Sequence, residues 1–217
     1  MSALTTALEG LLAEHDRIGS PVRRYLTKGR PEAEVRSRLQ ALGLDPADDL
    51  VAFYAWQDGI ETDVWRRKHE TGDLYLYPVY TSPSLIEAEE LLRIGRLVSA
   101  EAFGTARRKR EDIPDVGYWA KSWFPLFIGD RTFVADSRGD RSSMVWGQAS
   151  HPDGPTMPLY RSIVELIDDI AGRFRRGAYT WLEDVGDYGG DPELWMAIDS
   201  EAEVRARDVV IDPSARY

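Results

Sequence analysis

The chain contains no cysteine among its 217 residues, and this absence excludes several kinds of chemistry at once. Disulfide frameworks, thiolate nucleophiles, iron–sulfur ligation and every cysteine-containing zinc site require that residue. Histidine is nearly as scarce, because only His15, His69 and His151 occur, and none has a second histidine at metal-ligand spacing. We therefore expect no metal site, and we expect each histidine to be a surface or structural residue.

Motifs for nucleophilic catalysis and nucleotide binding are also missing. The sequence has neither a Gly-x-Ser-x-Gly elbow nor a Gly-x-x-x-x-Gly-Lys loop, and the glycines of residues 186–190 lack the spacing of a dinucleotide loop. Adjacent carboxylates at 48–49, 89–90 and 168–169 carry little weight, because neighbours on a helix point to different sides and are usually solvated. The acidic cluster Glu183, Asp184, Asp187 and Asp191 fits no calcium-loop pattern. We expect no catalytic residue and no cofactor.

The charge balance separates the classes of partner. Acidic residues outnumber basic ones by 37 to 27, which gives a formal net charge of −10 and argues against general binding to nucleic-acid phosphates. One basic run, residues 107–110, is followed directly by Glu111 and Asp112 and is typical of a solvated loop. No apolar stretch approaches the ~20 residues of a membrane span, and residues 1–10 lack a signal-peptide pattern. We expect a cytoplasmic protein with a protein partner, no nucleic acid and no membrane, and the sequence leaves the oligomeric state open.

Apolar spacing and turn residues predict the secondary structure. We expect an N-terminal helix that ends at Gly19, and a further helix that opens after Ser82, its predicted cap. Three other helices are expected over 31–42, 46–57 and 160–176, with a short one around 192–204. Strands are expected over 74–80, 124–128, 131–136 and 143–148, and the two-residue turn Gly129-Asp130 makes the middle pair a hairpin.

This order of elements indicates an α+β fold, a single domain with a central antiparallel sheet flanked by helices. Helices come first, then strands, then a long helix, and no regular strand–helix alternation demands parallel crossovers. We expect an N-terminal helical extension over 1–30 and the α+β domain over 31–182. The remaining residues, 183–217, are expected to form an acidic C-terminal extension that packs on the domain.

Several segments, taken in order, resemble the SUKH superfamily of bacterial toxin-immunity proteins, which also includes fungal regulators of cell-wall synthesis. The resemblance begins at Leu44–Gly59, with a proline-started helix, an aromatic pair and a polar-glycine stop. The family commonly has Asn-Gly at that stop, where this chain has Asp58-Gly59. The resemblance continues through Leu76-Tyr77-Pro78, the helix after Pro83, Trp123–Phe127, the strand 132–136 and the helix 163–174. It covers roughly residues 32–182.

The resemblance implies a compact fold that binds another protein, frequently a toxin domain such as a nuclease, and blocks it. We therefore expect a non-enzymatic immunity protein that binds and neutralises a basic toxin domain. Its expected partner contacts are Asp58, Glu61, Asp63 and Trp65, at and after the helix stop, and the alternative for each is a solvated turn residue. Two other functions remain open: a housekeeping regulatory or scaffold role, as in the fungal members, and a hydrolase that uses convergent carboxylates.

Overall fold

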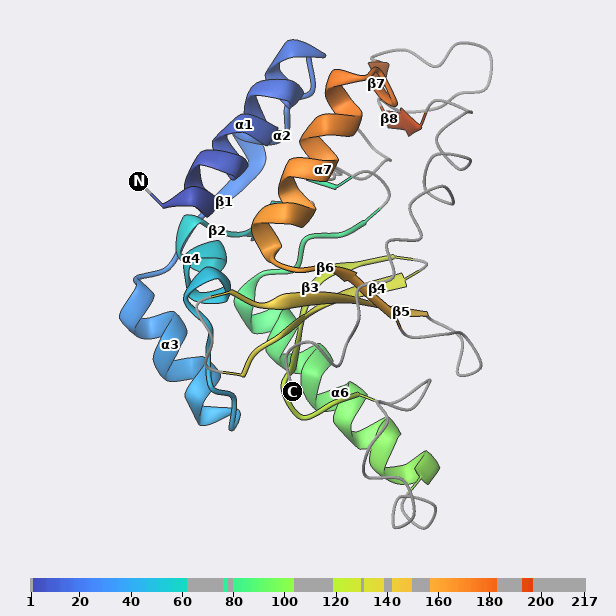
Figure 1. Cartoon of the computed structure of the whole chain (residues 1–217). Coiled ribbons are helices and arrows are strands. Elements are labelled where there is room, and N and C mark those ends of the chain that lie inside the picture. The colour runs from blue at the N-terminus through green and yellow to red at the C-terminus, as the bar shows by residue number, and fades with distance from the viewer. Residues whose placement is uncertain are drawn as a thin grey trace.

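A four-stranded antiparallel sheet forms the centre of the protein. In the computed structural model, the strand order of this sheet is β3-β4-β5-β6. The structure describes residues 2–61, 76–77, 80–103, 119–129, 131–138, 142–149, 157–182 and 193–196. The strands are β3 (Trp123–Ile128), β4 (Arg131–Asp136), β5 (Met144–Ala149) and β6 (Met157–Tyr160). Helices α1 (Ala3–Arg17), α4 (Asp48–Trp56) and α7 (Ile163–Arg175) lie on one side of this sheet, and α6 (Leu85–Phe103) lies on the other (Figure 1). The predicted α+β fold class is confirmed.

Shorter elements surround this centre. They are α2 (Val22–Tyr25), β1 (Leu26–Lys28), α3 (Glu32–Ala41), β2 (Gln57–Ile60), β7 (Tyr179–Leu182) and β8 (Glu193–Met196). β1 pairs with β2, and β7 pairs with β8, each as an antiparallel two-stranded ribbon. The β1–β2 ribbon joins residues that are about thirty positions apart, so it fixes the end of α4 against the N-terminal segment.

Helix α1 belongs to the same core as the sheet. Its leucines at 4, 8, 11 and 12 are buried, and the helix packs along α7. At its end the Arg17 Nη2 donates to the backbone oxygen of Phe174 at 2.8 Å. The helix that the sequence analysis assigned to an N-terminal extension is thus packed into the domain.

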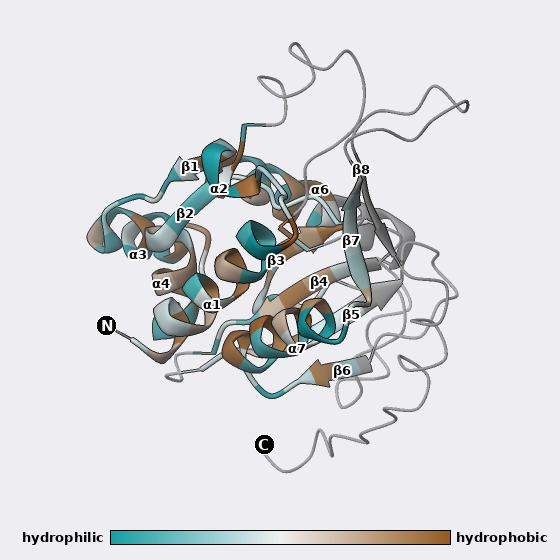
Figure 2. Cartoon of the chain, turned by 90° about the horizontal axis from the view of Figure 1, so that it is seen from above, coloured by the Kyte–Doolittle hydropathy of each residue, from teal (hydrophilic) through white to brown (hydrophobic). Residues whose placement is uncertain are grey.

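The hairpin and the long helix form as predicted. β3 and β4 pair around residues 129–130, and Thr132 lies opposite Ile128. In α7 the Ser162 side chain accepts from the Glu165 N–H at 3.1 Å, as a capping box requires. The Glu165 carboxylate accepts from the N–H of Arg161 at 2.7 Å, one residue earlier than the usual partner. Hydrophobic and hydrophilic residues occupy opposite sides of α7 (Figure 2).

The start of α6 differs from the prediction. Ser84, rather than Ser82, makes the cap, because its Oγ accepts from the Glu87 N–H at 3.3 Å while the Glu87 carboxylate accepts from the Ser84 N–H at 2.8 Å. Ser82 is buried and accepts from the Gln57 side-chain amide at 3.2 Å. The helix also runs on past Gly95, where the sequence period is lost. A Cβ on Gly95 would lie 2.6 Å from the ring of Trp119, so the glycine allows that ring to pack against the helix.

Two other predictions are wrong in the described residues. Within the predicted strand 74–80, Tyr77 pairs only with Tyr80 as an isolated bridge, because the chain turns there and the Tyr80 N–H bonds back to the Tyr77 oxygen at 2.9 Å. Within the predicted helix 192–204, residues 193–196 form β8, since pairing with β7 satisfies their backbone. The basic run 107–110, the acidic cluster of residues 183–191, His69 and His151 lie outside the described residues.

Candidate functional site

The end of α4 is a tightly built junction of three segments. The backbone turns at Gly59, whose φ is +88°, into a conformation that glycine adopts most easily. A Cβ at this position would also lie 2.8 Å from the backbone nitrogen of Ser84, so the chain before α6 passes directly against the glycine. The Gln57 side chain accepts from the Gly59 N–H at 2.6 Å and donates to Ser82. The polar-glycine stop therefore has a structural role, because its contacts connect α4 and β2 to the start of α6.

Asp58 lies inside this junction. Its side chain is 7% exposed, and its two carboxylate oxygens have separate partners. Oδ1 accepts from the N–H of Leu85, the first residue of α6, at 2.7 Å, and Oδ2 accepts from Arg30 Nε at 2.6 Å. Arg30 also donates to Glu34 at 2.7 Å, and its hydrogen bonds to Glu34, and next to Asp58, raise the pKa of the guanidinium. Asp58 thus caps one helix and neutralises a cation from the segment before α3.

The structure describes two of the four expected partner contacts, Asp58 and Glu61. Asp58 is buried with both oxygens engaged, so its carboxylate faces the fold rather than a partner. Glu61 is exposed, and its backbone N–H extends the β1–β2 ribbon by donating to the Tyr25 oxygen at 2.8 Å. Asp63 and Trp65 lie outside the described residues. Glu61 is therefore the expected contact that the structure places on the surface.

A second ion pair, of a half-buried arginine with a buried carboxylate, holds α3 against α6. The guanidinium of Arg38 donates through Nε and Nη2 to the two oxygens of Glu89, each at 2.6 Å, and the Glu89 side chain is 7% exposed. Glu90, the next residue, is exposed. Bidentate geometry of this kind fixes both partners in one orientation.

A buried carboxylate on α4 receives backbone donors from distant segments. Asp49 accepts from the Ser143 N–H at 2.8 and 2.9 Å and from the Ser143 hydroxyl at 2.9 Å. Burial raises the pKa of Asp49, and the hydrogen bonds from Ser143 and from the N–H of Ile163 oppose that rise. The carboxylate therefore links α4 to the start of β5 and the start of α7.

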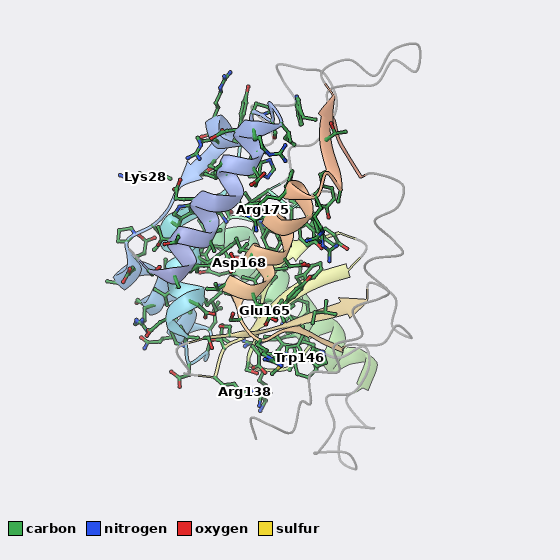
Figure 3. All side chains as sticks on the ribbon, turned by 45° about the horizontal axis from the view of Figure 1, so that its top comes forward. Lys28, Arg138, Trp146, Glu165, Asp168 and Arg175 are labelled. Carbon is green, nitrogen blue, oxygen red and sulfur yellow. The ribbon has the colours of Figure 1, made fainter. Side chains whose placement is uncertain are left out.

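A cluster of tyrosines surrounds the ion pair on α7. Arg173 donates to Asp169 at 2.8 Å, the Tyr160 hydroxyl donates to the same carboxylate at 2.9 Å, and Tyr179 hydrogen-bonds to Arg173. Burial raises the pKa of Tyr160 and of Tyr179, so both phenols stay neutral near pH 7. Glu165, Asp168 and Arg175 lie along the same helix in Figure 3, and all three are exposed. The buried pair therefore serves packing between α7, β6 and β7.

These contacts were not predicted from the sequence. Adjacent carboxylates do point to different sides, as expected, but one member of each pair is buried rather than solvated: Asp49, Glu89 and Asp169. The signal that identifies Glu89 is its place in the apolar stripe of its helix, between Ala88 and Leu92. Nothing in the sequence identifies Arg38 as its partner, because 51 residues separate the two.

Among the residues that the structure describes, no group of three histidine or carboxylate side chains could hold a metal ion. No described helix combines the length and the apolar character needed to cross a bilayer. The chain matches no family model and no curated protein.

Proposed function

We propose that the protein is a non-enzymatic, SUKH-like immunity protein that acts in the cytoplasm and neutralises a basic toxin domain such as a nuclease. The junction at residues 57–59 carries this proposal. Each residue of the polar-glycine stop that bears the resemblance makes a specific contact there, and the neighbouring segments follow in the same order: α4, residues 76–77, α6, the β3–β4 hairpin and α7. Because the residues of this motif have specific structural roles, their occurrence supports the resemblance more strongly than a match of residue types alone would.

The surface beside this junction suits a protein partner. Glu61 is exposed, and none of the hydrogen bonds or ion pairs found among the described residues uses its carboxylate. The backbone beneath it is fixed by the β1–β2 ribbon and by the buried Asp58, so the carboxylate extends from a rigid element. The net charge of −10 attracts a basic partner over long range, and an exposed carboxylate at the edge of the contact increases the association rate.

Coexpression with a toxin tests the proposal directly. The toxin to be tested is the C-terminal domain of a secreted multidomain protein, where one is encoded beside the gene for this chain, and it is expressed in a host that lacks both genes. We expect growth to stop when the toxin domain is expressed alone and to recover when this chain is expressed with it. A purified complex of defined stoichiometry should accompany the recovery. If the chain gives no protection and forms no complex with that domain, the immunity proposal is wrong, and a housekeeping role takes its place.

A charge reversal tests the expected surface separately. Glu61→Arg should slow association with the toxin domain by roughly three- to tenfold at low salt, because a rim charge acts mainly on the association rate. Asp168→Arg on the outer face of α7 makes a comparable charge change at another exposed position and serves as the control. Equal effects of the two variants would show that only the net charge matters and would remove Glu61 from the interface.

A further inference from the structure

We draw no further inference here: the strongest candidate, the neighbouring buried tryptophans Trp123 on β3 and Trp146 on β5, whose indole N–H groups have no hydrogen-bond acceptor among the described residues, supports no ligand site, because nothing in the described part of the chain shows that the two N–H groups face a common cavity.

Discussion

The buried histidine of α1 makes the stability of the fold depend on pH in the acid range. His15 is fully buried, with Nε2 at 3.0 Å from the Leu76 backbone oxygen and Nδ1 at 3.1 Å from the Ser20 hydroxyl. A carbonyl oxygen only accepts, so Nε2 carries the hydrogen and Nδ1 accepts from the hydroxyl. The ring packs on Phe174, with their centroids 4.6 Å apart. The neutral imidazole thus has both partners that it needs, and a charged one would be enclosed by apolar groups.

The pKa of His15 sets both the sign and the size of the effect. Burial lowers this pKa from 6.5 to about 4 in the folded protein. Above about pH 6.5 neither the folded nor the unfolded chain binds the proton, so the full stability is present. Between about pH 6.5 and about pH 4 only the unfolded chain binds it, and the free energy of unfolding falls by up to ~1.4 kcal/mol per pH unit. We expect the total loss from this group to be about 3 kcal/mol.

Urea unfolding followed by tryptophan fluorescence measures this loss. The wild type and His15→Leu are compared from about pH 7.5 down to about pH 4, so that groups common to both proteins cancel. At neutral pH the variant is less stable, because the Leu76 oxygen loses its donor. That difference should shrink by about 3 kcal/mol toward pH 4, whereas Ser20→Ala, which keeps the imidazole, should retain the wild-type pH dependence. A difference between wild type and His15→Leu that stays constant with pH would refute a neutral, buried imidazole.

Three further expectations concern the junction and its ion pairs, and urea unfolding at neutral pH checks each of them. Gly59→Ala should lower the free energy of unfolding by about 2–4 kcal/mol, because it combines a positive φ with a backbone clash. Gly43→Ala, at φ +75° with open space around the glycine, should lower it by only about 1 kcal/mol, so equal losses would contradict the clash. Arg38→Ala should lower it by about 2–3 kcal/mol by leaving the Glu89 carboxylate buried and unpaired, and adding Glu89→Leu should recover most of that loss. Asp58→Asn should lower it by about 1–2 kcal/mol, because the amide oxygen still caps α6 but the ion pair is lost, and Asp58→Ala should lower it further.

Local signals in the sequence were sufficient where the structure depends on neighbouring residues. The β3–β4 hairpin follows from two apolar runs around a glycine-containing turn, and α7 follows from Ser162, Glu165 and its apolar stripe. The strands β6 and β7 were not predicted, because each is four residues long and depends on a partner strand. The sequence does not indicate that α6 continues beyond Gly95, because the helical pattern is lost there, whereas in the structure the ring of Trp119 packs against this glycine.

The candidate site was only partly predictable for a related reason. Its position follows from the polar-glycine stop, which the sequence places correctly at the end of α4. The burial of Asp58 does not, because it depends on Arg30, 28 residues earlier, and on the N–H of Leu85, 27 residues later. An aspartate before a glycine is typical of a solvated turn, and only the tertiary partners decide otherwise.

The buried ion pairs also change where the acidic charge of the chain acts. Asp58, Glu89 and Asp169 each neutralise an arginine within the fold, so they contribute little field at the surface. The described residues contain nearly equal numbers of acidic and basic side chains, whereas acidic residues far outnumber basic ones in the sequence 183–217. Most of the net charge of −10 therefore belongs to segments outside the described residues, which include Asp63 of the expected contacts. Under the proposed function, attraction of a basic partner should accordingly depend more on those segments than on Glu61, and the β1–β2 ribbon with the junction at residues 57–59 is the rigid surface that we propose for docking.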